Sequence, residues 1–298
     1  MLEIFNKDLV QPPRELNNPA ASSSSAKPRL GQSPLSKALY VLKKLPLLFF
    51  FPRAAASPPK LSQEILKSFV SQSSNAFSIS FESATSFAYV TPEKPYSIHQ
   101  RYWCCMDDIY CIFLENLNNL YTLIKEYGLS KGTNEAMFLI EAYRTLRDRG
   151  PYPADQVLKD LDGSFGFVVY DNKAKTVFVA LGAKEEIKLC WGVTADESVV
   201  ISDNLEVIKA SCAKSFARFS AGCMFRSEHG GFMSFEHPTK KMKAMPRIDS
   251  EGVMCGANFK VDVQSRIHSL PHVGSKANWA MWGSHSDRSR VLLEHKKT

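Results

Sequence analysis

Large apolar side chains point to both sides of residues 161–180, which read as two strands joined by a polar turn. In the first strand Phe165 and Phe167 share one face, and Val168 and Tyr170 lie on the other. The second strand shows the same pattern, with Val177 and Val179 on one face and Phe178 on the other. A hairpin with one face in water would alternate apolar and polar residues. The pattern therefore predicts strands that are covered on both faces.

Helical and strand patterns divide the rest of the chain. Thr133 is placed to cap a helix, and Gly128 stands where a helix end favours a left-handed residue. Apolar residues at helical spacing predict helices over residues 62–71, 117–127, 134–149 and 205–210. Strands are predicted at residues 2–5, 76–82, 86–90 and 108–115, and in a long antiparallel series from 161 to 245.

This order of elements indicates an α+β fold rather than alternating βαβ units. One covered face of the strands can meet the helices, and the other most economically meets a second sheet. We therefore expect a four-layer αββα sandwich made mainly of antiparallel sheets. We assign residues 1–30 and 60–245 to one domain, 31–59 to an insertion or linker, and 246–298 to a partly ordered C-terminal extension.

The net charge of +7 over 298 residues is unevenly placed. Residues 1–60 carry nine Lys or Arg against three Asp or Glu, and residues 238–298 carry eleven against five, so the middle of the chain is acidic. A nucleic-acid groove would gather basic and aromatic residues on one folded face. No such cluster is visible, and we expect no nucleic-acid partner.

The seven cysteines show no paired spacing. Several lie in apolar, strand-like runs, which favours reduced, buried thiols in a cytoplasmic or nuclear protein. His268 and His272 have helical spacing, but Pro271 between them argues against a shared face, and we expect no metal site.

An apolar run at residues 38–52 is interrupted by Lys43, Lys44 and Pro46 and falls short of the ~20 residues that span a bilayer. We interpret it as an apolar insertion, with docking to a membrane surface or a partner as one alternative, and expect no transmembrane segment.

Two short motifs identify a family. Tyr127-Gly128-Leu129 and Leu146-Arg147-Asp148-Arg149, together with "PYPADQV" and "LDGSFGFVVYD", resemble the plant aluminium-induced or stem-specific proteins with YGL and LRDR motifs. That family in turn resembles the class II glutamine amidotransferase domain, an N-terminal-nucleophile hydrolase with a four-layer sandwich. The motif residues themselves also have structural interpretations, as a helix end and as surface ion pairs.

The resemblance implies a cysteine nucleophile at position 2, where this chain has Leu2. It also implies an oxyanion hole built from an Asn-Gly pair, and the matching residues are Leu114 and Glu115. Leucine has no nucleophile, and a carboxylate would repel a developing oxyanion. The equivalents of the substrate-binding residues are Arg101 for the carboxylate and Asn134, with Glu135 beside it, where an aspartate would hold the α-ammonium group.

These substitutions favour a pseudoenzyme: a non-catalytic, amidotransferase-like plant protein that responds to aluminium, hormone or other stress and acts through binding or assembly. An amide hydrolase or glutaminase with a relocated nucleophile is the alternative. We expect no cofactor, an unidentified protein partner, and exposed strand ends that are compatible with a homodimer.

Overall fold

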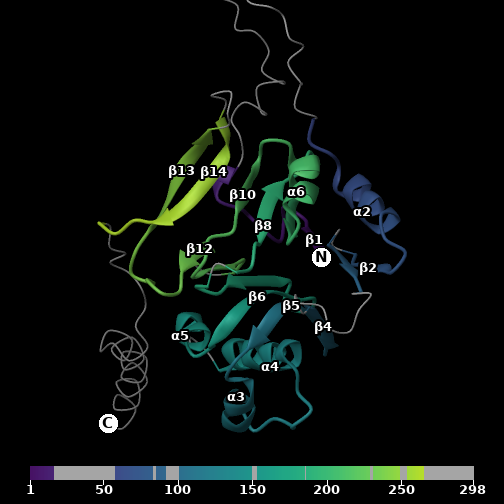
Figure 1. The fold of residues 1–298 in the computed structure, drawn as a ribbon. Coiled ribbons are helices and arrows are strands. Elements are labelled where there is room, and N and C mark those ends of the chain that lie inside the picture. Colours follow the sequence, from purple (N-terminus) through teal and green to yellow (C-terminus); the bar gives the residue numbers. More distant parts are fainter. Residues whose placement is uncertain are drawn as a thin grey trace, which may run out of the picture.

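Two six-stranded sheets lie face to face between two layers of helices (Figure 1). The structure is a computed structural model. It describes residues 1–16, 58–82, 85–91, 101–149, 153–184, 186–228, 231–248 and 254–264. The expected insertion at 31–59 falls almost wholly outside these ranges, as do the apolar run at 38–52 and both histidines discussed above. In the described part of the chain, no helix has the length and apolarity that crossing a membrane requires.

Each sheet is antiparallel between all its registered neighbours. The first sheet, sheet A, has the order β10-β8-β9-β1-β3-β2, and the second, sheet B, has the order β12-β11-β7-β6-β5-β4. The strands of sheet A are β1 (Leu2–Phe5), β2 (Ala76–Ser80), β3 (Ser86–Val90), β8 (Cys190–Val193), β9 (Val199–Ser202) and β10 (Phe216–Arg218). Those of sheet B are β4 (Arg101–Met106), β5 (Ile109–Leu117), β6 (Gly163–Asp171), β7 (Thr176–Leu181), β11 (Cys223–Arg226) and β12 (Gly231–Ser234).

The helices cover the outer faces of the two sheets. Helices α2 (Ser62–Ser71) and α6 (Leu205–Cys212) pack on sheet A, whereas α4 (Glu135–Asp148) packs on sheet B. Helices α3 (Leu120–Glu126) and α5 (Ala154–Lys159) contribute to the same apolar cluster as α4. This arrangement confirms the four-layer sandwich.

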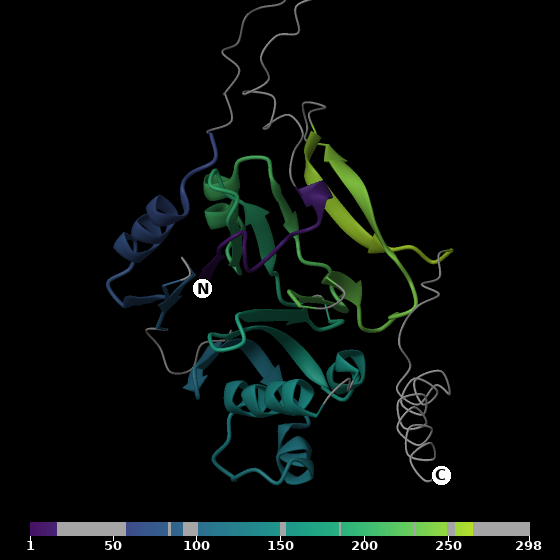
Figure 2. The ribbon, with the colours of Figure 1, turned by 180° about the vertical axis from the view of Figure 1, so that it is seen from behind.

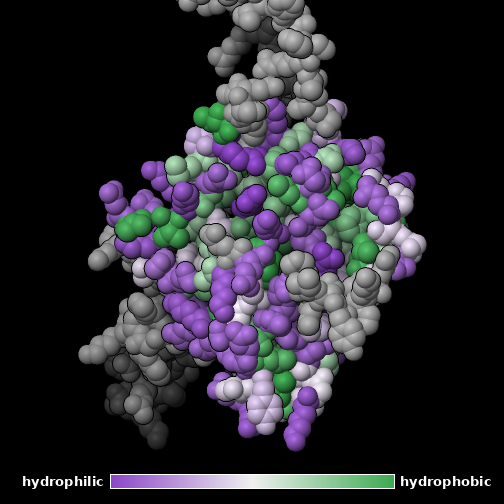
Figure 3. Space-filling view, viewed as in Figure 1, coloured by the Kyte–Doolittle hydropathy of each residue, from purple (hydrophilic) through white to green (hydrophobic). Residues whose placement is uncertain are grey.

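Burial on both faces of the central hairpin is confirmed. Phe165 and Phe167 pack toward the helices of sheet B, while Val168 and Tyr170 face sheet A. All nine residues of β6 are buried. Because the interior takes up these apolar side chains, the face drawn in Figure 3 is largely hydrophilic over the described residues.

The YGL motif ends helix α3. Gly128 has a φ of +66°, the N–H of Leu129 donates to the carbonyl of Ile124 at 2.9 Å, and that of Gly128 donates to Lys125 at 3.2 Å. These two bonds form a Schellman motif, which satisfies carbonyls at the helix end. Tyr127 also packs edge to face on Phe138. The predicted helix end is thus confirmed.

The LRDR motif reaches from the surface to a buried carboxylate, which was not expected. Arg147 donates to Asp148 at the surface, but its Nη1 also donates at 2.8 Å to Asp171, whose side chain is fully buried. Asp171 accepts the backbone N–H groups of Lys173 and Ala174 in the β6–β7 turn. The interpretation as surface ion pairing was therefore incomplete, because Arg147 fixes a hairpin turn from the helical layer.

Two local predictions need correction. The cap of α4 is Asn134, whose side chain accepts the N–H of Met137 at 2.9 Å, and not Thr133. Strand β4 was not predicted. It joins β5 through Asp107 and Asp108, which both have positive φ, as a two-residue turn of type I′ requires.

A hairpin lies beside the sandwich. It consists of β13 (Met242–Ile248) and β14 (Met254–Val261), and both views place it next to β10 (Figures 1 and 2). Ala257 and Phe259 join the core between the sheets. A short 3₁₀ helix, η1 (Arg14–Leu16), contacts β14. The hairpin spans position 245, where the domain was expected to end, and the chain beyond residue 264 lies outside the described part.

Candidate functional site

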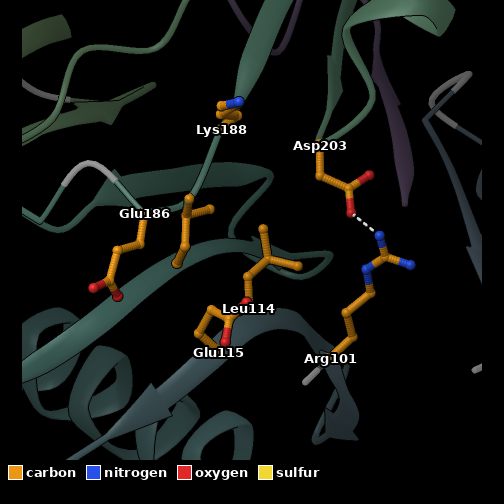
Figure 4. Close-up of a pocket in the computed structure, with 7 residues that line it drawn as sticks. Arg101, Leu114, Glu115, Glu186, Lys188 and Asp203 are labelled. Atoms are coloured by element: carbon orange, nitrogen blue, oxygen red, sulfur yellow. Dashed lines mark ion pairs between the residues drawn. The ribbon is translucent and has the colours of Figure 1, made fainter. Parts of the chain in front are cut away.

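A cavity of about 260 Å³ opens where the two sheets meet near β1, and we call it the mixed-charge pocket (Figure 4). Strands β4 and β5 supply one wall, the end of β9 supplies another, and the segment before β8 closes the third. Its described lining consists of Arg101, Leu114, Glu115, Glu186, Ile187, Lys188 and Asp203.

An ion pair crosses this pocket from sheet to sheet. Arg101, at the start of β4, places its Nη2 at 2.5 Å from Asp203, which directly follows β9 (Figure 4). The other carboxylate oxygen of Asp203 accepts a hydrogen bond at 2.8 Å from the α-ammonium group of Met1. Burial lowers the pKa of that amine, although the charge of Asp203 opposes the effect. Asp203 thus neutralises two cations from different strands.

Glu3 lies behind the pocket in the core between the sheets. Strand β1 alternates, so Met1 and Phe5 face sheet B while Leu2 and Ile4 face the helices. The Glu3 side chain is fully buried, and neither carboxylate oxygen has a hydrogen-bond partner among the described residues. Burial raises the pKa of Glu3 well above its usual 4.5, against the opposing Met1 ammonium. Burial therefore favours the protonated, neutral form of Glu3.

The structure brings three of the expected site residues together and separates the others. Arg101 and Leu114 are directly opposite in the register of β4 and β5, and Glu115 follows, so all three line the pocket. Leu2 is fully buried on the other face of its strand. Asn134 does not line the pocket.

Glu115 has a φ of +66° within β5, a left-handed backbone that favours glycine. This is the position at which the resemblance implies the glycine of an Asn-Gly pair. The left-handed backbone at this position would suit a glycine, but this chain carries a carboxylate side chain there.

The start of α4 has a structural role in this chain. Asn134 caps the helix, and Glu135 lies buried in its first turn. Neither residue is part of the described pocket lining. The family motifs Tyr127-Gly128-Leu129 and Leu146-Arg147-Asp148-Arg149 are likewise on the helical layer of sheet B and stabilise it.

Sequence reasoning missed Asp203, Glu186 and Lys188 as site residues. Asp203 carried a signal, since a carboxylate directly after the apolar strand "SVVIS" stands at a sheet end, where sites commonly form. Glu186 and Lys188 alternate with buried Ile187 in an otherwise unremarked segment. Nothing in their local pattern indicated a pocket.

The thiols and potential metal ligands lie elsewhere. Cys111, Cys190, Cys212 and Cys223 are buried, and burial raises the pKa of each thiol, to about 12 for Cys212 and Cys223. Cys105 alone of the six described cysteines is exposed. In the described ranges, no group of three His, Cys, Asp or Glu side chains is arranged to hold a metal ion.

Comparisons with known proteins give one family and several distant structures. A family model described as "Aluminium induced protein" matches residues 50–261. The stem-specific protein TSJT1 of Nicotiana tabacum is 55% identical over 75 residues, which is 25% of this chain and 50% of that protein. The chain thus spans about half the length of this curated relative.

Similar solved structures include the glutamine phosphoribosylpyrophosphate amidotransferase of B. subtilis complexed with ADP and GMP, at 14% identity and a TM-score of 0.37 over 51% of this chain and 35% of that one. A glutamine aminotransferase class-II domain protein from Silicibacter pomeroyi is similar at 10% identity and a TM-score of 0.33, over 50% of this chain and 72% of its own. Likenesses this slight carry no argument about activity.

Proposed function

Since the chain belongs to the aluminium induced protein family, we propose that it is a non-catalytic, amidotransferase-like plant protein that responds to stress and acts by binding or assembly. The proposal combines the family's name, the plant source of the relative and the sequence motifs with the chemistry of the mixed-charge pocket. That pocket is lined by Arg101, Leu114 and Glu115, which are the expected equivalents of the substrate-binding and oxyanion-hole residues of an amidotransferase.

The composition of the pocket lining carries the proposal. Covalent amide hydrolysis needs a hydroxyl, thiol or amine that can attack a carbonyl. Among the described lining residues there is no Ser, Thr or Cys, and the amine of Lys188 is exposed to water. The Met1 α-amine contacts Asp203 but is not itself part of the lining, and it is held in an ion pair with that carboxylate. The described lining therefore offers shape and charge without an activated nucleophile.

The oxyanion position also supports a non-catalytic role. Removal of one donor from an oxyanion hole typically costs ~10²–10³ in rate. Here the aliphatic Leu114 has no donor, and the carboxylate of Glu115 has the same sign of charge as the oxyanion that would develop beside it. A reaction of this kind would be opposed by the site.

The alternative, an amide hydrolase with a relocated nucleophile, would need a thiol that ionises easily. Buried thiols ionise less easily, and the pKa of Cys104 is also raised by burial. Only Cys105, on the edge strand β4, is both described and exposed. Among the described residues no carboxylate, His or Lys is hydrogen-bonded to it, and its hydrogen-bond partner is Tyr110, so nothing favours this alternative over binding.

Ammonia release from glutamine by the purified full chain tests the proposal. We expect no release above a buffer blank, before and after treatment with a thiol-alkylating reagent. Saturable release that is lost in Arg101→Ala and kept in the surface control Lys67→Ala would overturn the proposal. Release lost on alkylation of Cys105 would establish the relocated nucleophile instead.

A further inference from the structure

A second cavity, of about 490 Å³, adjoins the mixed-charge pocket at Ile187 and Lys188, and we call it the basic groove. It lies between the end of β10 and the β13–β14 hairpin, which stand side by side in Figures 1 and 2. The hydroxyl of Ser220 donates to the carbonyl of Phe259 at 2.7 Å and ties these two walls together. Its volume is in the range of small-molecule sites, about 300–1,000 Å³.

The floor of the groove is apolar and ordered by packing. Leu189, Phe219 and Phe259 line it and are at most 6% exposed. Phe219 and Phe259 both pack on Trp191, with ring centroids at 5.3 Å and 6.0 Å. These contacts fix the rings, so the floor is pre-formed and can accept a flat apolar group.

The rim carries positive charge without counter-charge. Lys188, Arg218 and Lys260 line the groove and are exposed. Within the described ranges, none of the three forms an ion pair, and no Asp or Glu lines the groove. Elsewhere the described cations are commonly paired, as Arg147 is with Asp171. Three unpaired cations and buried aromatic rings in one lining make the groove complementary to a ligand that is both anionic and apolar.

We propose that the basic groove binds an amphipathic organic anion. A carboxylate, sulfonate or phosphate group lies among Lys188, Arg218 and Lys260, where the guanidinium can bind two oxygens at once. An aromatic or alkyl body lies over Phe219 and Phe259. This proposal does not depend on the lack of a nucleophile in the mixed-charge pocket. A finding of amide hydrolysis there would therefore not contradict binding in the basic groove.

Titration with 8-anilinonaphthalene-1-sulfonate tests the groove, because this probe joins an anionic group to a flat apolar body and fluoresces on leaving water. With the folded full chain at low salt, we expect saturable binding at one site. Arg218→Ala should raise the Kd about tenfold, the change expected on loss of one charge-assisted contact. Lys67→Ala, which removes an exposed cation from α2, is the charge-matched control and should leave the Kd unchanged.

Competition separates charge from apolarity. Decanoate should displace the probe, whereas decanol and inorganic phosphate should do so only at concentrations at least about tenfold higher, since each has half of the required chemistry. The proposal is overturned by a lack of saturable binding, by equal Kd values for Arg218→Ala and Lys67→Ala, or by equal displacement by decanoate and decanol. Near-ultraviolet circular dichroism of each variant verifies the native packing, because partly unfolded chains also bind this probe.

Discussion

The mixed-charge pocket and the basic groove share a wall but treat charge in opposite ways. In the pocket, Arg101 on sheet B and Met1 on sheet A both contact Asp203, so the charged groups satisfy one another. In the groove, Arg218 and Lys260 line the same cavity as apolar rings, and neither has such a partner in the described chain. Charged groups that line a cavity can therefore either hold the fold together or remain available to a ligand. The partners of those groups show which role applies.

The largest effect is expected when the carboxylate of Asp203, which pairs with both Arg101 and the Met1 amine, is removed. Asp203→Asn should lower the free energy of unfolding by about 2–3 kcal/mol, because Arg101 and the Met1 amine both lose their counter-charge. Arg218→Ala should change it by less than ~0.5 kcal/mol, as expected for an exposed, unpaired group. Urea denaturation of both variants measures the two values. Equal losses would show that the two cavities do not differ in this way.

A pH-dependent effect is expected from the buried acid behind the pocket. The pKa of Glu3 is raised in the folded state. Below about pH 4.5 Glu3 is protonated in both the folded and the unfolded chain, so it does not affect the free energy of unfolding. As pH rises from there toward the folded-state pKa, only the unfolded chain loses the proton, and the fold loses stability. Glu3→Gln should therefore gain stability over the native chain as pH increases from about 5 to about 8. Each unit of pKa difference is worth about 1.4 kcal/mol.

Thermal melts at the two pH values measure this difference in Tm. A domain of this size shifts by about 2–4 °C per kcal/mol. Glu64→Gln on the exposed face of α2 is the control and should show no such trend. A pH-independent difference for Glu3→Gln would show that Glu3 is charged in the fold.

The smallest expected effect concerns the backbone of Glu115. Glu115→Gly and Glu115→Ala both remove the carboxylate, but only glycine adopts a φ of +66° without steric cost. The glycine variant should be more stable than the alanine variant by about 1 kcal/mol. Urea denaturation of the pair compares them directly. A more stable alanine variant would mean that residue 115 no longer adopts the left-handed backbone conformation once Glu115 is replaced.

Much of the fold could be predicted because it follows from local sequence patterns, such as the alternation of apolar side chains along a strand. Phe165 and Val168 point to opposite faces of a strand whatever surrounds it, and the two covered faces required two neighbours. Gly128 likewise marked the end of α3. The site was harder to predict. Asp203 and Arg101 lie about a hundred residues apart in sequence and meet only when the two sheets pack.

The missed features have the same origin. Arg147 reaches Asp171 across 24 residues, so its neighbour Asp148 was the visible partner in sequence. Strand β4 depends on a turn in which two aspartates adopt positive φ, which side-chain type alone indicates weakly. Asn134 and Thr133 are both able to cap α4, and only the path of the chain decides between them.

Strand β6, buried along its whole length, has a practical consequence for anyone who shortens this chain. A fragment that keeps sheet B and its helices but omits sheet A would expose Val168, Tyr170 and their neighbours as a flat apolar surface, a recognised hazard for aggregation. The sandwich therefore has no separable half. Insoluble fragments would report on the missing sheet rather than on the residues deleted with it.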